Sequence, residues 1–167
     1  YELLDDPTEQ DLSCPRVQAG VERLLLAGAF AQVGAGPVCS SFSQAVNPPC
    51  RTWAFPRGRP GLSEAMRAKV ALGNLFSDWV ARLVGLCLDS GVHFWIENPS
   101  SSWRWRQRRW RRLRSSPLVG ELLTDYCRWG APWRKRTLFL TSNAVAGSRL
   151  LCDRTHSHVV LRGLVKG

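Results

Sequence analysis

The chain has 167 residues, of which 44% are hydrophobic, and a formal net charge of +10. A chain of this length buries roughly two-thirds of its surface on folding, so residues 1–167 are expected to form a single globular domain. No uncharged apolar stretch reaches the roughly 18 residues that a membrane helix needs, which predicts that no segment crosses a membrane.

The positive charge is concentrated in one part of the chain. Between Arg104 and Arg136, ten Arg and one Lys stand against only Glu121 and Asp125. Such a field favours a polyanion, because binding releases the counterions condensed on a nucleic acid. The excess of Arg over Lys and the interleaved Trp residues favour nucleic acid over the alternative, a solvated surface with loosely bound anions.

The six cysteines show no paired C-x-x-C spacing, and a chain of this length does not need disulfides to fold. We therefore expect a reducing, intracellular compartment, the nucleus if the source is eukaryotic. Cys152, His156 and His158 could supply three zinc ligands, but no fourth ligand is obvious from the sequence. The favoured interpretation is that they are surface polar residues, and no metal site is predicted.

The first predicted elements alternate between helix and strand. Apolar spacing predicts a helix over 15–27, with Gly28 as its stop signal, and a short buried strand over 30–34. This order is typical of an α/β sheet, in which sites lie beyond the carboxyl ends of strands. The loop after Gly34 is therefore a candidate site, whereas the Pro- and Gly-rich segment 46–61 is expected to be irregular.

A long helix should follow, because Ser63 can cap it and a broad apolar face extends from Met66 to Leu86. The next predicted strand, 92–96, leads into Glu97-Asn98-Pro99. Pro99 disfavours helical geometry at the preceding residue, so the Glu97 carboxylate is expected at an extended strand end. This strand end is the second candidate site.

Residues 103–114 are predicted to form one amphipathic helix, with Trp and Leu on one stripe and Arg on most of the remainder. The alternative is a helix anchored by Trp with an Arg face that only contacts water. Two further strands are expected over 122–127 and 137–141, joined by a tight basic turn over 129–136.

Three motifs occur in order along the chain: Gly36-Pro-Val-Cys-Ser-Ser-Phe-Ser43, then Glu97-Asn98-Pro99, then the turn from Gly130 to Arg136 with Thr137. In composition and order they resemble the motifs of cytosine-5 DNA methyltransferases, and the resemblance covers most of the chain. It implies an α/β, Rossmann-like, S-adenosylmethionine-dependent methyltransferase fold that is incomplete in this chain.

The resemblance also implies roles for single residues. The first motif is similar to the family's G-P-P-C-x-x-F-S loop, which makes Cys39 the nucleophile. The second is similar to its E-N-V or E-N-P motif, which makes Glu97 the partner of cytosine ring nitrogen 3. The third resembles the Y-G-x-P-x-R-K-R-T form of phage-type and mobile-element relatives, which makes Arg134 and Arg136 the base- or phosphate-contacting residues. A gapless alignment to the more usual Q-x-R-x-R pattern instead places Trp133, Lys135 and Thr137 at the signature positions.

This chemistry needs those residue types. Carbon 5 of cytosine is not nucleophilic enough to attack a sulfonium methyl group unaided. Addition of a Cys thiolate to carbon 6 produces an enamine-like intermediate, provided that a donor at ring nitrogen 3 absorbs the developing charge. A loop Cys, a strand-end carboxyl group and an Arg-rich element are thus the minimal set.

Further residues are assigned by the same resemblance. Asp11 in Asp11-Leu12-Ser13 resembles the acidic residue that accepts a hydrogen bond from the adenine amine of S-adenosylmethionine. Ser41 and Ser43 would shape the loop or contact phosphate. The basic segment is expected to bind nucleic acid through six residues: Arg104, Arg106, Arg108, Arg109, Arg111 and Arg112.

Besides the basic turn, the sequence departs from the family pattern at two points. Val38 stands where the family places Pro before its nucleophile, and Pro would stiffen that loop. No D-x-F-x-G-x-G-like segment occurs, and we expect it before Tyr1. The function predicted is methylation of cytosine in DNA; the alternatives are a catalytically inactive relic that binds nucleic acid or a partner, and methylation of RNA.

Overall fold

Five strands form one mixed sheet in the order β1-β2-β4-β3-β5. The computed structural model describes residues 10–142 and 148–160. Strand β1 runs parallel to β2, β4 runs antiparallel to both β2 and β3, and β5 runs parallel to β3. The strands are β1 (Gln32–Ala35), β2 (His93–Pro99), β3 (Gly120–Asp125), β4 (Arg136–Thr141) and β5 (Arg149–Leu150).

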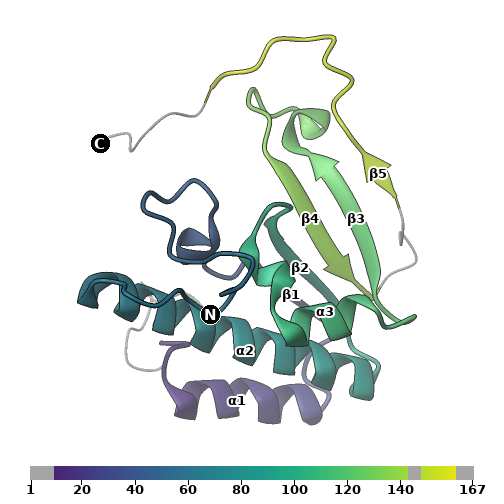
Figure 1. The fold of residues 1–167 in the computed structure, drawn as a ribbon. Coiled ribbons are helices and arrows are strands. Elements are labelled where there is room, and N and C mark those ends of the chain that lie inside the picture. The colour runs from purple at the N-terminus through teal and green to yellow at the C-terminus, as the bar shows by residue number, and fades with distance from the viewer. Residues whose placement is uncertain (1–9, 143–147, 161–167) are drawn as a thin grey trace.

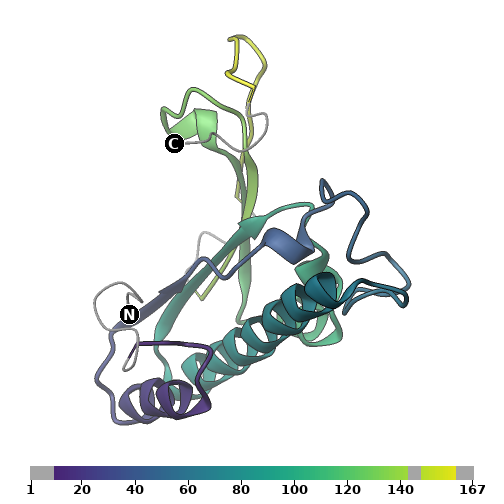
Figure 2. The ribbon, with the colours of Figure 1, turned by 90° about the vertical axis from the view of Figure 1, so that its left-hand side faces the viewer.

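Helices α1 (Pro15–Leu26) and α2 (Glu64–Ser90) lie on the same side of this sheet (Figures 1 and 2). The Ser63 side chain caps α2 by accepting from the Met66 amide, and Gly91 ends the helix with a left-handed φ of 68°. Helix α2 is long and apolar enough to cross a membrane by length and composition, but half of its most apolar window is buried within the protein. This burial is typical of a core helix.

The core lies between α2 and one face of the sheet. Phe94 and Ile96 of β2, with Leu138 and Leu140 of β4, are buried there against the apolar face of α2. Because side chains alternate along a strand, Glu97 projects to the opposite face, next to its cross-strand neighbour Phe139. The sheet thus has one face covered by long helices and one face that presents Glu97.

Several short elements complete the chain: η1 (Ser40–Phe42), η2 (Trp103–Arg106), α3 (Arg108–Arg114) and η3 (Tyr126–Trp129). Element η3 lies at the end of the β3–β4 arm, which projects away from the helical layer (Figure 2).

The α/β class predicted from the sequence is confirmed, as are the helix near 15–27, the long helix capped by Ser63 and the strand over 137–141. The single helix predicted over 103–114 is wrong. Gln107 is extended there, with a ψ of 145°, and separates η2 from α3. Its buried side chain contacts Ser77 and Asn74 of α2, and this tertiary contact outweighs local helical preference.

The predicted strand boundaries also need correction. The strand expected over 30–34 begins at Gln32, and β2 continues past the expected end at 96 to include Pro99. The strand expected over 122–127 spans Gly120–Asp125, so Cys127 lies in η3 instead of in the sheet.

Element η1 packs closely on α2 at Gly73. A Cβ atom on Gly73 would lie 2.5 Å from Ser41 Oγ and 3.2 Å from Phe42 Cε2. A second glycine in the same helix, Gly85, has nothing within 4 Å of its Cβ position. The absence of a side chain at Gly73 therefore allows η1, and the loop before it, to lie against α2.

These two glycines supply a matched test. Gly85→Ala should raise the free energy of unfolding by roughly 0.5–1 kcal/mol, because Ala loses less backbone entropy in a helix. Gly73→Ala should lower it by about 1–3 kcal/mol, because the added methyl group displaces η1. Chemical denaturation of both variants measures the difference, and an equal gain in both would contradict the close packing.

Candidate functional site

The loop that follows β1 lies against the end of β2. A Cβ atom on Gly36 would be only 3.6 Å from Glu97 Oε2, and the buried Asn98 amide donates to the Pro37 carbonyl oxygen at 2.9 Å. Cys39 follows this anchored segment and is exposed at the start of η1. The structure therefore brings the loop that carries Cys39 to the strand end that carries Glu97.

Three donors converge on one oxygen of Glu97. Its Oε1 accepts from Lys135 Nζ at 2.9 Å, from the Tyr126 hydroxyl at 3.3 Å and from Thr137 Oγ1 at 3.4 Å. Burial lowers the pKa of Lys135, but the hydrogen bond and charge of Glu97 outweigh it and raise that pKa, with a smaller contribution from Cys39. The carboxylate and the loop thiol thus share Lys135 as a neighbour.

Arg134 and Arg136 pair with a different carboxylate. Arg136 forms a bidentate pair with the buried Asp125, at 3.0 and 2.9 Å, and Arg134 lies 3.4 Å from the same group. The hydrogen bond from Arg136 is the main reason that the pKa of Asp125 falls to about 2. The residue of this basic turn that contacts Glu97 is Lys135. Lys135 is also one of the residues that the gapless alignment to Q-x-R-x-R places at the signature positions.

Arg104 is buried, and its side chain holds the loop that carries Val38 and Cys39. Its Nη2 donates to the Val38 carbonyl oxygen at 2.7 Å, and its guanidinium lies 4.5 Å from the Phe42 ring centroid. Burial lowers the pKa of Arg104 to about 10. The expectation that Arg104 belongs to an exposed nucleic-acid-binding face needs correction, because the side chain has no contact with solvent.

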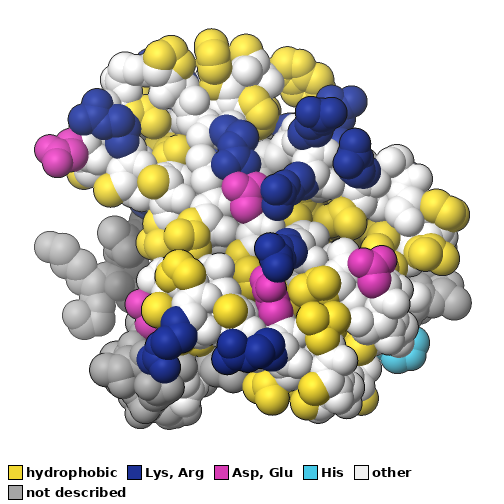
Figure 3. All heavy atoms as spheres, turned by 90° about the horizontal axis from the view of Figure 1, so that it is seen from below, with side chains coloured by type: hydrophobic (Ala, Val, Ile, Leu, Met, Phe, Trp, Pro, Cys, Tyr) yellow, Lys and Arg dark blue, Asp and Glu magenta, His cyan; other side chains and the backbone are white. Residues whose placement is uncertain are grey.

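The other predicted Arg residues of this segment are exposed: Arg106, Arg108, Arg109, Arg111 and Arg112. Arg106 lies 4.2 Å from the ring centroid of Trp53, whose side chain is 68% exposed. Sequence reasoning missed Trp53 because it lies in the Pro- and Gly-rich segment, which carries no periodic signal. Basic side chains also spread over the face that α1 and α2 form (Figure 3).

The two loop serines have structural contacts. Ser41 is buried, and its Oγ accepts from Arg51 Nη2 at 2.9 Å. Ser43 Oγ accepts from the Ala45 amide at 3.1 Å. Of the two predicted roles, the contacts fit loop shaping, and direct contact of Ser41 with phosphate needs correction because the residue is enclosed.

Asp11 lines a groove of about 720 Å³ that is also lined by β1 and by Val38. Its Oδ1 accepts from the Ser13 amide at 2.8 Å, and hydrogen bonds with Ser13 lower the pKa of Asp11. Trp79 also lines the groove, and its buried Nε1 has no hydrogen-bond partner among the described residues.

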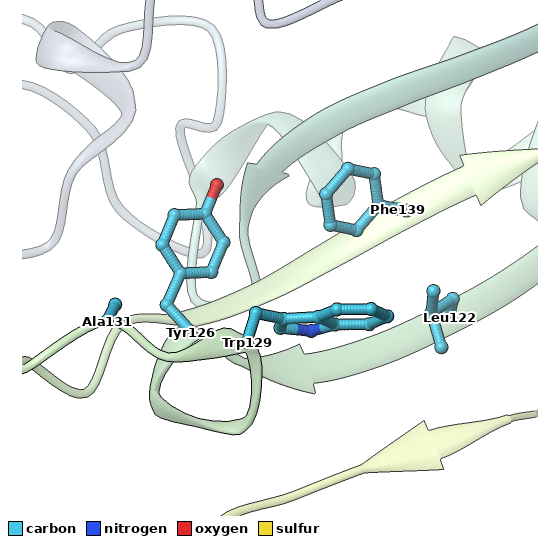
Figure 4. Close-up of a pocket in the computed structure, with 5 residues that line it drawn as sticks. All are labelled: Leu122, Tyr126, Trp129, Ala131 and Phe139. Carbon is cyan, nitrogen blue, oxygen red and sulfur yellow. The ribbon is translucent and has the colours of Figure 1, made fainter.

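An aromatic pocket of about 460 Å³ lies on the side of the sheet that presents Glu97 (Figure 4). Its lining consists of Leu122, Tyr126, Trp129, Ala131 and Phe139. Tyr126 belongs both to this pocket and to the hydrogen-bond cluster on Glu97. Flat apolar walls beside a carboxylate suit a planar ring with polar edges.

Comparisons with protein-family models, with curated proteins and with solved structures find no match to this chain.

The role of Arg104 can be tested by truncation. Arg104→Ala should lower the free energy of unfolding by about 2–4 kcal/mol, because it leaves a cavity beside Phe42 and the Val38 carbonyl without its donor. Arg108→Ala, at an exposed position of the next element, should stay within about 0.5 kcal/mol of the unmodified protein. Thermal and urea unfolding measure both, and equal stabilities would show that Arg104 does not hold the loop.

Proposed function

We propose that this chain is the catalytic portion of a cytosine-5 methyltransferase that acts on DNA. The observation that supports this most is the contact of the Gly36–Cys39 loop with Glu97 and Asn98 at the end of the neighbouring parallel strand. The proposal includes a Rossmann-like sheet, of which the parallel β1–β2 pair would be the part that holds the site.

In this proposal the Cys39 thiolate adds to carbon 6 of cytosine and a new carbon–sulfur bond forms. The electron pair of the 5,6 double bond moves to carbon 5, while a protonated Glu97 donates to ring nitrogen 3. Carbon 5 then takes the methyl group from the sulfonium sulfur, whose bond to that methyl group breaks and leaves a neutral thioether. Loss of the carbon 5 proton to water, return of the ring nitrogen 3 proton to Glu97 and expulsion of the Cys39 thiolate restore the double bond. The base must leave the stack to reach this edge of the sheet.

Lys135 would support two steps of this chemistry. Its ammonium group donates to Glu97 Oε1 and lies near enough to Cys39 for the thiolate charge to raise the Lys135 pKa. Lys135 would therefore orient Glu97 and place a positive charge near the loop that carries Cys39.

S-adenosylmethionine would supply the methyl group as an electrophilic sulfonium. In the proposed site, Asp11 and the groove along β1 would hold this cofactor. Val38, which precedes the proposed nucleophile in the chain, also lines this groove.

The chemical step can be tested by covalent trapping. With S-adenosylmethionine and duplex DNA that contains 5-fluorocytosine, the full-length protein should form a denaturation-resistant adduct, because fluorine on carbon 5 cannot leave as a proton. Cys39→Ser should abolish the adduct, and Glu97→Gln should slow its formation by about 10²- to 10⁴-fold. Gel electrophoresis and mass spectrometry of the adduct measure both effects.

Cys14→Ser is the matched control, because Cys14 lies before α1, outside the site, and should leave trapping unchanged. A second assay needs no methyl transfer: addition of Cys39 alone should release tritium from carbon 5 of labelled cytosine to water. If the full-length protein binds DNA but neither traps 5-fluorocytosine nor releases tritium, from DNA or from structured RNA, the catalytic proposal fails and the non-catalytic binding module replaces it.

DNA binding should depend on the exposed Arg residues of α3. Arg108→Ser with Arg112→Ser should reduce the slope of log K against log salt by up to about 2, because each phosphate contact contributes about 0.9. Arg67→Ser with Lys69→Ser, two exposed basic residues of α2, is the charge-matched control. Fluorescence anisotropy with two unrelated duplexes measures the slopes, and equal slopes for both double variants would place the anion elsewhere.

A further inference from the structure

Four side chains of the kinds that bind zinc converge where η3 meets the segment after β5. The potential ligand atoms of Cys127, Cys152, His156 and His158 all lie within 4.8 Å of one another. The sequence indicates three of them, but Cys127 is far upstream and is brought to the other three only by the fold. The structure therefore supplies the fourth ligand that the sequence did not reveal.

Two of the spacings between these atoms match a tetrahedral metal. With Zn–S bonds near 2.3 Å and Zn–N bonds near 2.0–2.1 Å, the ligand atoms of a tetrahedral zinc site are about 3.4–3.8 Å apart. Cys152 Sγ lies 3.4 Å from His158 Nε2 and 3.8 Å from His156 Nε2. These contacts need little or no rearrangement to accept an ion between them.

The surroundings of the ligands also suit a metal site. The Arg154 amide donates to Cys152 Sγ at 3.2 Å, and Arg154 adopts a left-handed φ of 66° that turns the chain around the sulfur. His156 turns its other ring nitrogen toward Asp153 Oδ1, at 3.8 Å. A carboxylate behind a ligand histidine orients the ring and increases its basicity.

We propose that Cys127, Cys152, His156 and His158 bind one zinc ion. Four protein ligands leave no open coordination position, so the ion would be structural and would take no substrate. It would fasten the segment 149–159 to η3 and to the basic turn. One hydrogen bond between this segment and the turn is already present, from the Val159 amide to the Pro132 carbonyl oxygen. The inference does not depend on the proposed methyltransferase activity.

The test measures metal in the whole chain, purified under reducing conditions and desalted. Elemental analysis should find one zinc per chain. Exchange for Co²⁺ should produce the visible bands of a tetrahedral ion together with thiolate-to-cobalt charge transfer. Cys127→Ser and His158→Gln should each reduce the bound zinc to a small fraction, and His158→Cys should retain it, because three Cys and one His also form a zinc site.

Two variants control for residue type. Cys14→Ser and His93→Gln remove a thiol and an imidazole that lie outside the cluster, and both should keep one zinc. The proposal would be overturned if the unmodified chain contains no metal, or if the cobalt spectrum is that of an octahedral ion. Equal loss of metal in the control variants would overturn it too. A Cys127–Cys152 disulfide found by mass spectrometry in protein kept reduced would overturn it as well. The His158→Cys rescue separates loss of a ligand from loss of folding.

Discussion

Strands β1 and β2 run parallel, with Gln32 to Ala35 in register with His93 to Ile96, so both leave the sheet at the same edge. This pairing is the constraint on which the candidate site depends. It places Gly36 against the Glu97 carboxylate and lets Asn98 bond to Pro37. An antiparallel pair would have put the two chain segments at opposite edges.

Two buried guanidinium groups then hold the loop in place without any carboxylate partner among the described residues. Arg51 donates to the Ser41 and Val70 carbonyl oxygens, and Arg51 and Arg104 both contact the ring of Phe42. Burial lowers the pKa of each group to about 10, which expresses the cost of removing a charge from water. Carbonyl oxygens and a ring face offset part of that cost, and they do so only if the loop keeps this conformation. Arg104 Nε and Nη1 have no hydrogen-bond partner among the described residues.

The sequence predicts the elements better than their contacts. Pro99 after Glu97 indicates an extended strand end, and Ser63 before an apolar face indicates a helix start, because both signals are local. The choice between Arg136 and Lys135 as the neighbour of Glu97 depends on which face of β4 each side chain takes. Alternation shows that they differ, but only the register with β2 shows which faces Glu97. The burial of Arg104 is equally non-local, because it follows from the packing of η1 on α2.

Asp125 connects the two sites. It receives Arg134 and Arg136 on one side and the Cys152 amide, at 2.9 Å, on the other. Because Arg134 and Arg136 flank Lys135, the carboxylate that fixes the proposed zinc ligand also fixes the two residues on either side of the Glu97 partner. Loss of order at the cluster would weaken the hydrogen bond between Cys152 and Asp125. Because Asp125 also pairs with Arg134 and Arg136, the position of Lys135 between them would be less fixed. The segment after β5 thus contributes to the geometry at Glu97 through Asp125, whereas the donors described for the Glu97 carboxylate are Tyr126, Lys135 and Thr137.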